Sequence, residues 1–372
     1  MSVRCHELIR ELENWAPKHL AEDWDNIGLL LGSPEQSIHK ILVTLDVDRD
    51  AVRQAVSMGA DMIVAHHPLI FKGISNIRTD LPLGNMLCDL IKNEIAVYAA
   101  HTNLDSAACG VNDILAQKFN LKEVQPLTSV YQEKLYKLVV FVPNSHIEQV
   151  RNAIAESGAG HIGNYSHCTF TSQGIGTFLP LPASNPFIGQ QNKLERVDES
   201  RLETIVPEQL RSSVINAMLA AHPYEEVAYD EYLLLNKHNN YGLGRIGQLT
   251  KPMTLADFAK QVKEVLMANS LAVAGDAQKT MKKVAVCGGS GASLISTALK
   301  AGADVLVTGD VKYHEAQQAI AEGLAIIDAG HFATELPVVE GIRAYLNEQS
   351  KKNGWTVEIS ANNVSKDVFT AY

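Results

Sequence analysis

Residues 63–68 read Ile-Val-Ala-His-His-Pro, and the rest of the chain is organised around this stretch. β-favouring and small residues lead directly into two adjacent histidines, and Pro68 then ends the run. The pattern predicts a buried strand with His66 and His67 at its carboxyl end. In open α/β sheets, ligands bind at that end of the strands. Two ordinary polar residues in a loop are the alternative, and the other segments of the chain must decide between them.

The composition is that of a globular protein whose main partner is not nucleic acid. The chain has 372 residues, of which 46% are hydrophobic and 20% charged, so its length favours two or three domains. The net charge of −10 argues against a protein that wraps nucleic acid, because backbone affinity comes from clustered Lys and Arg. The five cysteines lack metal-finger or redox spacing, which indicates reduced thiols. Since neither a signal peptide nor a membrane-spanning run is visible, we expect a soluble, cytoplasmic protein with no membrane partner.

Both outer segments alternate between strand and helix patterns. Toward the amino end we expect strands at 41–45, 61–65 and 95–100, and helices at 3–15, 48–58 and 84–93. Toward the carboxyl end we expect strands at 283–287, 304–308 and 324–328, and helices at 254–268, 292–301, 313–322 and 334–348. Such alternation predicts an α/β fold with parallel strands and right-handed crossovers.

The middle of the chain follows a different order. We expect a strand at 135–142, a helix at 145–157, a hairpin within 158–196, a helix at 207–221 and a strand at 227–235. This order, βαββαβ, is typical of a ferredoxin-like domain. The predicted organisation is therefore one α/β domain made of 1–132 and 238–372, interrupted by an α+β insert of 133–237.

The two outer segments also resemble each other. Residues 55–64 (AVSMGADMIV) align with 298–307 (ALKAGADVLV), and a shorter match follows in the same order further on. If one inserted residue is allowed, His101 and Asp105 then fall opposite His331 and Glu335, which are also four residues apart. A duplication would give two pseudo-symmetric α/β halves with a site between them. The alternative is that α/β units simply look alike.

Six polar residues follow the short apolar strands and could meet at one edge of a sheet: His66, His67, His101, Asp105, His331 and Glu335. This mixture of imidazoles and carboxylates suits zinc, iron, manganese or nickel, whereas calcium and magnesium prefer oxygen ligands alone. A carboxylate shared by two ions would hold them about 3.5–4 Å apart, and such a pair lowers the pKa of a water and polarises a carbonyl, imine or phosphoryl group. Structural histidines and helix N-terminal carboxylates are the alternative.

Three weaker signals accompany this set. The run 287–292 (CGGSGA) follows a strand and opens a helix, where backbone N–H groups could hold a phosphate, although tight packing is the simpler explanation. Asp310 and His314 could contact metal ligands or substrate, or cap a helix. In the middle segment, 222–226 (HPYEE) carries polar groups that could bind an effector, but a turn before the last strand is the simpler explanation.

Taken together, the motifs resemble the type 2 GTP cyclohydrolase I family, also called the Nif-three-like family of dinuclear-metal proteins. The resemblance covers about 1–130 and 240–372 and rests on the motifs at 25–29, 66–68, 101–105 and 330–335. The insert, through 222–230, is similar to the PII-like (CutA-like) domain of the longer bacterial members.

The resemblance implies specific roles for the six polar residues. The implied metal ligands are His66, His67, Asp105, His331 and Glu335, with Glu335 bridging two divalent ions, and His101 is implied as a proton shuttle. Zinc or iron is the expected metal, with manganese or nickel as alternatives. The resemblance also implies a toroidal homohexamer.

The implied activity is that of a metal-dependent hydrolase of a small, nucleotide-like substrate. The family name points to opening of the purine ring of GTP at C8, which gives formate and dihydroneopterin triphosphate. Nothing in the sequence specifies guanine, and phosphoester hydrolysis would suit the same ions. A second hypothesis is a metal-binding regulatory or scaffold protein with the PII-like insert as sensor or lid. Purely structural metals fit less well, because structural zinc usually has cysteine ligands.

Overall fold

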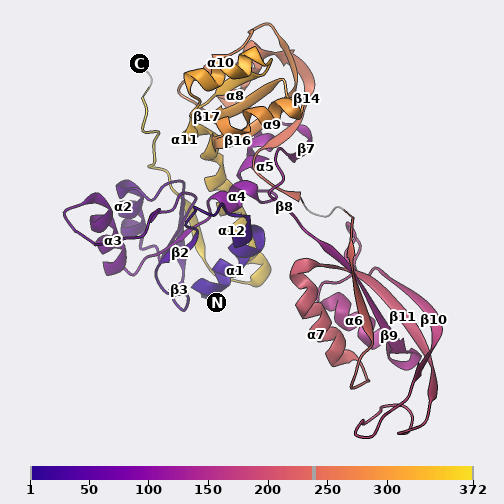
Figure 1. Ribbon diagram of the computed structural model, residues 1–372. Helices are drawn as coiled ribbons and strands as arrows, with labels where there is room; N and C mark the ends of the chain where they lie inside the picture. Colours follow the sequence, from indigo (N-terminus) through magenta and orange to yellow (C-terminus); the bar gives the residue numbers. More distant parts are fainter. Residues whose placement is uncertain (1, 237–239, 371–372) are drawn as a thin grey trace. The chain divides into compact units, whose positions relative to one another are not determined.

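The computed structural model describes residues 2–236 and 240–370, and they fold into two compact units (Figure 1). One unit, called the outer unit below, combines the chain up to Tyr131 with the chain from Tyr241 onward. The other, called the insert, comprises Gln132–Asn240. Each unit has a hydrophobic core of its own, which is the physical mark of a separate domain.

The outer unit contains a five-stranded sheet in the order β19-β4-β5-β6-β2. Its strands are β2 (Gly28–Leu31), β4 (Lys40–Thr44), β5 (Met62–Ala65), β6 (Ala96–Ala99) and β19 (Glu358–Ala361). The first four strands of this order run parallel, and β2 is antiparallel to β6. Every residue of β5 and β6 is buried, which explains the uninterrupted apolar runs that predict these strands.

Two helices connect the central strands of this sheet. α2 (Arg49–Met58) joins β4 to β5, and α3 (Pro82–Lys92) joins β5 to β6. The side chain of Asp48 accepts a hydrogen bond of 2.7 Å from the N–H of Ala51 and so caps the start of α2. Gly59 ends α2 with a φ of 65°, a left-handed conformation that glycine adopts without strain. The two crossovers therefore place the carboxyl ends of β4, β5 and β6 at one edge.

A second sheet of six strands, in the order β15-β18-β17-β16-β14-β7, lies in the same unit. Its strands are β7 (Lys122–Pro126), β14 (Arg245–Thr254), β15 (Ala272–Ala274), β16 (Thr280–Ser290), β17 (Val305–Gly309) and β18 (Ala325–Asp328). Its helices are α8 (Leu255–Leu266), α9 (Ile295–Lys300) and α10 (Tyr313–Ala321). Alternate residues of β16 and β17 enter two different core clusters, one shared with α8 and the other with α9 and α10. The central strands are therefore covered on both faces, as parallel strands require.

Further helices complete the outer unit. They are α1 (Cys5–Trp15), α4 (Thr102–Ser106), α5 (Val111–Lys118), α11 (His331–Glu335) and α12 (Pro337–Asn353), with the short elements β1 (Val3–Arg4), β3 (Ser37–Ile38), η1 (Lys18–Leu20) and η4 (Ala292–Leu294). Val338, Ile342 and Leu346 form a stripe on α12 that packs into the same core cluster as Leu8 and Leu12 of α1. Truncating the leucine or isoleucine of this stripe to alanine costs about 2–5 kcal/mol. This packing anchors the carboxyl-terminal segment, including α11, beside the amino-terminal sheet.

The insert is a four-stranded antiparallel sheet in the order β10-β11-β9-β12. In chain order its elements are β9 (Leu135–Pro143), η2 (Asn144–His146), α6 (Ile147–Glu156), β10 (Thr169–Phe178), β11 (Glu195–Pro207), η3 (Glu208–Leu210), α7 (Arg211–Ala221) and β12 (Tyr229–Leu234). Val150 of α6 and Val214 of α7 share a core cluster with inward-facing residues of β9 and β11. The strands and longer helices follow the order that the sequence predicts. The short strands β8 (Tyr131–Gln132) and β13 (Asn240–Tyr241) pair with each other.

α5, β7, β14 and β15 are among the elements that are not predicted from the sequence. In α5 the inward positions include polar residues: Asn112 donates to the backbone carbonyl of Asp105, and Asp113 pairs with the buried guanidinium of Arg245 at 2.7 Å. Polar residues at inward positions hide the apolar period on which such predictions depend. The last long helix is also displaced: the prediction is 334–348, whereas a separate turn, α11, precedes α12.

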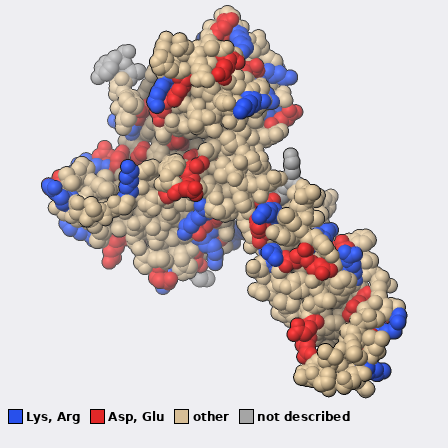
Figure 2. Space-filling view, viewed as in Figure 1, with Lys and Arg blue, Asp and Glu red and all other residues tan. Residues whose placement is uncertain are grey.

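The helices and the surface charges can be compared with what a membrane partner and a nucleic-acid partner would require. Among the described residues, no helix is long and apolar enough to cross a bilayer. Figure 2 shows Lys and Arg side chains interspersed with Asp and Glu on the visible face. That face therefore lacks the basic stripe by which proteins follow a phosphate backbone.

Candidate metal centre

The candidate centre lies at the carboxyl edge of the five-stranded sheet. His66 and His67 directly follow β5, and His101 follows the neighbouring parallel strand β6 after Ala100. The backbone N–H groups of His66 and His67 still donate to carbonyl groups at the end of the β4 segment, at 3.1 and 2.9 Å. The two adjacent histidines are thus held by the sheet and do not lie in a free loop.

Short helices supply the remaining side chains. Asp105 lies in α4, which begins directly after His101. His331 and Glu335 lie four residues apart in α11, on one side of a single helical turn. Gly330, with a φ of 83°, leads into α11 with a backbone conformation that other residues rarely adopt.

Glu335 is the centre of the cluster. Its Oε2 lies 3.0 Å from Nε2 of His67 and 3.1 Å from Nε2 of His331. Its Oε1 lies 3.9 Å from Nε2 of His66, and that nitrogen is 3.5 Å from Oδ1 of Asp105. Three overlapping sets have ligand atoms within 4.8 Å of one another: His66, His67 and His101; His67, His331 and Glu335; His66, Asp105 and Glu335. The structure therefore brings together all six residues that the sequence analysis collects.

The histidines of this cluster are oriented by acceptors on their far side. Nδ1 of His66 donates to the carbonyl of Ala100 at 2.8 Å, and Nδ1 of His67 donates to Oδ1 of Asp46 at the same distance. Nδ1 of His331 donates to Oδ2 of Asp310 at 2.7 Å. Because Nδ1 carries the proton in each ring, the neutral form presents the Nε2 lone pair to the cluster, the arrangement typical of metal-bound histidine.

The arrangement fits a bound cation, because lone pairs face one another in a buried place. With the imidazoles neutral, Nε2 of His66, Oδ1 of Asp105 and Oε2 of Glu335 are buried and have no hydrogen-bond donor. His66 is 0% exposed and Glu335 is 3% exposed. Buried acceptors normally find a donor, so three that converge without one need a positive charge between them. A nitrogen and oxygen donor set suits first-row divalent ions.

The pKa values show the same need for positive charge at the cluster. Without a metal ion, protons on the imidazoles beside Glu335 supply that charge. Burial alone would lower the pKa of His67, but the carboxylates of Asp46 and Glu335 outweigh it and raise that pKa to about 10. The Glu335 carboxylate raises the pKa of His331 to about 9. Burial would raise the pKa of Glu335, yet the facing imidazoles hold it well below its usual range.

His66 and Asp105 behave in the opposite way. Burial lowers the pKa of His66 to about 3, so this imidazole is neutral at physiological pH. Burial and the charge of Glu335 raise the pKa of Asp105 well above its usual range. A cation between Asp105 and Glu335 would oppose the shift of the Asp105 pKa, because it would neutralise the repulsion between the two carboxylates, the second cause after burial.

His101 is held by a different carboxylate. Its Nδ1 donates to Oδ1 of Asp25 at 2.9 Å, and Oδ2 of Asp25 accepts from the N–H and the hydroxyl of Thr102. Burial would raise the pKa of Asp25, but these donors outweigh it and lower that pKa to about 2. The Nε2 of His101 is thus left to face His66 and His67. In this position His101 can carry a proton or bind a cation.

The glycine-rich run does not form a phosphate cradle. The N–H of Gly288 donates to Oδ1 of Asn112, that of Gly289 to Oγ1 of Thr334, and that of Gly291 to a threonine hydroxyl. The N–H groups that a phosphate would need are therefore used within the protein. A Cβ at Gly289 would lie 2.2 Å from Oε1 of Glu335, so this glycine instead lets the backbone approach the cluster.

Of the two weaker candidates from the sequence, Asp310 lies beside the cluster and His314 lies outside it. Asp310, with a φ of 57°, contacts the metal-site candidate His331. His314 lies in α10, where Nδ1 is 3.4 Å from Oε1 of Gln317, and it does not join the cluster.

Sequence reasoning missed Asp46 and an aromatic pair. Asp46 lies just beyond the end of β4, in the same way that the two histidines lie just beyond the end of β5. A carboxylate at the end of a neighbouring strand was therefore the sequence feature that could have identified it. The rings of Trp24 and Phe71 are 5.7 Å apart and lie 6.0 and 6.3 Å from the ring of His101. Trp24 is 58% exposed, and its neighbourhood becomes visible only when the loops are folded.

The fold and the cluster define the class: an α/β protein whose histidine and carboxylate side chains could hold divalent metal ions. The chain matches the Duf34/NIF3 (NGG1p interacting factor 3) family over residues 3–368 and belongs to that family. This confirms the family predicted from the sequence motifs.

Relatives match along almost the whole chain. A protein named GTP cyclohydrolase 1 type 2 homolog from Halalkalibacterium halodurans is 46% identical over 363 residues, covering 98% of this chain and 97% of the relative. One of the same name from Bacillus subtilis is 44% identical over 369 residues and covers 99% of each chain. The crystal structure of a Bacillus cereus protein related to NIF3 has a TM-score of 0.93 and 45% identity, and it covers 100% of this chain and 99% of that one.

Proposed function

We propose that the protein is a metal-dependent hydrolase with a dinuclear site. His66, His67, Asp105, His331 and Glu335 would hold the ions, and the central Glu335 would be shared between them. The observation that carries the proposal is the convergence of three buried ligand atoms without hydrogen-bond partners. Zinc or iron suits this nitrogen and oxygen donor set, with manganese or nickel as alternatives. When bound, such ions supply Lewis-acid chemistry, which lowers the pKa of water and polarises a carbonyl, imine or phosphoryl group.

The chain's own residues would bind, orient and move protons. Asp46 and Asp310 fix the rings of His67 and His331 through hydrogen bonds of 2.8 and 2.7 Å. His101 would take a proton at Nε2 and later return it, while Asp25 stabilises the charged ring. A positioned acid or base of this kind contributes about 10²–10⁴-fold to a rate.

The substrate that we propose is a small, nucleotide-like molecule, and GTP is the first candidate because of the names of the relatives. The proposed reaction is hydrolytic opening of the GTP ring to dihydroneopterin triphosphate and formate. The exposed ring of Trp24 beside His101 supports a planar substrate group, because aromatic faces stack on such groups. Phosphoester hydrolysis is the alternative reaction at the same site.

The test is turnover by protein that is purified without added metal. We would follow hydrolysis of GTP and of bis-p-nitrophenyl phosphate, each with and without a chelator. Chelator-sensitive GTP opening supports the full proposal. Chelator-sensitive phosphodiester cleavage alone keeps the hydrolase and rejects the cyclohydrolase reaction. Absence of turnover on both substrates by metal-loaded protein rejects the hydrolase in favour of the second candidate.

The second candidate is a metal-binding regulatory or scaffold protein, with a PII-like insert as sensor or lid. The insert supports it, since its two long helices pack on one face of a sheet ordered β10-β11-β9-β12, the arrangement of a ferredoxin-like domain. A scaffold would show no turnover, and His67→Ala would impair partner binding. An enzyme would lose turnover with the same substitution and keep its assembly.

We also propose that the outer unit arose by duplication. Asp61 follows α2 and Gly59, and its Oδ2 accepts from the N–H groups of residues 39 and 40. Asp304 follows α9 and Gly302, and its Oδ2 accepts from the N–H groups of residues 282 and 283, at 2.8 Å each. Both glycines have a left-handed φ, of 65° and 75°. The same local solution at two aligned positions supports two related halves.

The toroidal homohexamer implied by the family stays a prediction. Light scattering at several protein concentrations tests it, and a mass equal to one chain of 40.6 kDa would reject it.

A further inference from the structure

The insert contains a cavity of about 730 Å³, within the size range of sites for small organic molecules. Phe141 of β9 and Arg201 of β11 line it, whereas the next residues along, Val140 and Leu202, enter the core on the helix-covered face. Because strand residues alternate between faces, the cavity lies on the face opposite α6 and α7. The connection between β10 and β11 supplies another wall, through residues 179–188.

One wall of the cavity is aromatic. The ring of Tyr224 lies 5.8 Å from that of Phe178 and 6.4 Å from that of Phe187, and all three residues line the cavity. Phe187 remains 53% exposed although it belongs to this wall. Aromatic faces carry negative charge density, so they attract cations as well as apolar groups.

A buried carboxylate lies beside the aromatic wall. Glu199 is 8% exposed, and its Oε1 accepts a hydrogen bond of 2.8 Å from the hydroxyl of Tyr224. A Cβ at Gly176 would lie 2.0 Å from Oε2 of Glu199, so the glycine makes room for this carboxylate. Burial and the neighbouring Glu199 raise the pKa of Tyr224 above its usual range, so the phenol keeps its proton and donates to the carboxylate.

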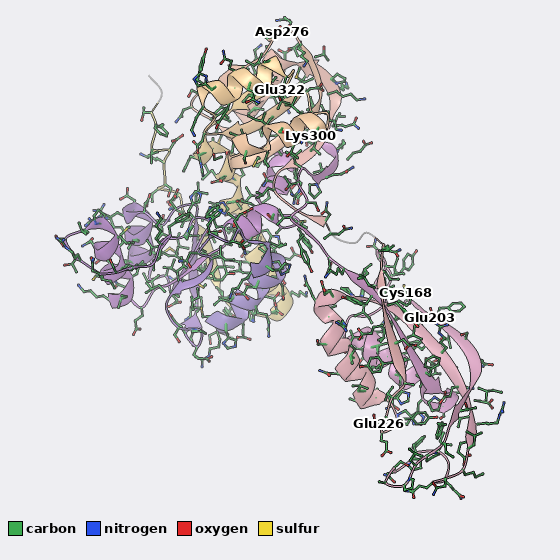
Figure 3. All side chains as sticks on the ribbon, in the orientation of Figure 1. Cys168, Glu203, Glu226, Asp276, Lys300 and Glu322 are labelled. Carbon is green, nitrogen blue, oxygen red and sulfur yellow. The ribbon has the colours of Figure 1, made fainter. Side chains whose placement is uncertain are left out.

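The charges of the lining are unbalanced. Glu225 and Glu226 line the cavity together with Glu199, and Arg201 is the one cation among the lining residues. Arg201 is already paired with Glu203, which is not a lining residue, at 3.1 Å. Figure 3 labels Glu226 and Glu203 on the insert. The cavity therefore has the charge complementary to a cation.

We propose that this cavity binds an organic ammonium compound, with its apolar body on Phe178, Phe187 and Tyr224 and its ammonium group at Glu199. A cation gains from the carboxylate and from the aromatic faces at once. A phosphate compound would meet three carboxylates and one arginine that is already paired with Glu203, so the lining disfavours it. The site is separate from the proposed metal centre and does not depend on hydrolase activity.

The test uses calorimetry on the full chain with three probes of matched shape. They are 4-phenylbutylammonium, 4-phenylbutanol and 4-phenylbutyrate, which differ in the charge of the head group. We expect the ammonium to bind most tightly and the carboxylate most weakly. In Glu199→Gln, which keeps the acceptor for Tyr224, the ammonium should bind at least about tenfold more weakly and the alcohol about as before. Equal binding of the three probes, or no binding of the ammonium at millimolar concentration, would overturn the proposal.

Two further variants distinguish loss of binding at this cavity from a general effect of substitution on charge or folding. Glu148→Gln, an exposed carboxylate of α6 that pairs with Arg151, should leave all three affinities unchanged. Phe187→Leu alters an exposed loop residue and should weaken the ammonium without loss of fold, which circular dichroism would check. If Glu199→Gln unfolds the insert, the Phe187→Leu result decides: an unchanged ammonium affinity there rejects the site.

Discussion

The two units treat their buried polar groups in opposite ways. In the outer unit, His66, Asp105 and Glu335 each have a buried ligand atom without a hydrogen-bond partner, and these atoms converge. In the insert, Ser200 donates to Asn144 at 2.6 Å, and the ring of His222 contacts the carbonyl of Phe141 at 3.0 Å. Among the described residues of the insert, one buried side-chain atom without a partner is found, Nε of Arg151, and no other such atom converges with it.

This difference indicates that the outer unit, unlike the insert, requires an external ligand. Unsatisfied buried acceptors cost free energy, so their persistence in one place indicates a charge that belongs there. The insert has no such convergence among its described residues, and no residue that lines its cavity has a buried polar atom without a partner. Metal binding should therefore act on the outer unit and leave the insert nearly unchanged.

The largest expected effect follows from loss of the central carboxylate. Glu335→Ala removes a member of two of the three ligand sets, so we expect both ions to be lost, as measured by metal analysis of the purified protein. The affinity should fall by more than the about 10–100-fold that loss of an outer hydrogen-bond partner costs. Glu340→Ala, an exposed residue of α12 paired with Arg343, is the control and should keep full metal content. Full metal content in Glu335→Ala would remove the basis of the comparison.

His101→Gln distinguishes a proton carrier from a metal ligand. As a proton carrier, His101 should leave metal content unchanged when replaced, while turnover falls about 10²–10⁴-fold because proton transfer is lost. His314→Gln, on α10 and outside the cluster, should change neither quantity. If metal content falls together with turnover, His101 belongs to the ligands.

Metal affinity should rise with pH. In the metal-free protein the pKa values of His67 and His331 are raised to about 10 and about 9, so both rings hold a proton at pH 6–8 that a metal ion must displace. Each displaced proton makes the affinity rise about tenfold per pH unit in this range and fall as the pH is lowered. His66, with a pKa lowered to about 3, has no proton to release there. Competition with a chromogenic chelator at several pH values measures the slope, and a flat profile would contradict the assigned ligands.

The acceptors behind the rings should matter less than the ligands. Asp310→Asn and Asp46→Asn leave the Nε2 atoms in place but weaken the orientation of His331 and His67, so we expect about 10–100-fold lower metal affinity in each. Asp50→Asn, an exposed residue of α2 that pairs with Arg53, should bind metal as the unaltered protein does. An unchanged affinity in both variants would show that the rings are held by packing alone.

The smallest expected effect is that of metal binding on the stability of the insert. Metal at about 100 times its Kd should stabilise the outer unit by about 2.7 kcal/mol, because it binds only the folded state. Hydrogen exchange with and without metal should then show slower exchange in β5 and α11 and no change in β9 and β11. Equal protection of both units would mean that they unfold together and would contradict a separate effect of metal on the outer unit.

The sequence predicted the parts of the site that depend on strand ends. The apolar runs before His66 and His101 are strands because they are buried on both faces, and that burial leaves a clear pattern. The placement of His331 and Glu335 on one side of the chain was predicted from their i,i+4 spacing, although the helix was predicted to begin only at 334. These local signals are enough to name the six residues.

Features that depend on tertiary contacts were beyond sequence reasoning. Asp25 reaches His101 across 76 positions in the chain, and Asp46 reaches His67 across 21. Contacts between residues so far apart in the chain produce no periodic pattern in the sequence. The specific role of Gly289 was also hidden: its backbone approaches Glu335, and its N–H donates to Thr334, so the run is tightly packed, as the simpler of the two explanations had it.

The most direct test of the central claim is metal analysis of the unaltered protein, purified without added metal, beside the Glu335→Ala variant. We predict about two first-row divalent ions per chain in the unaltered protein and almost none in the variant. Absence of bound metal in the unaltered protein, after incubation with zinc or iron(II) as well, would contradict the claim that the convergent side chains form a metal centre.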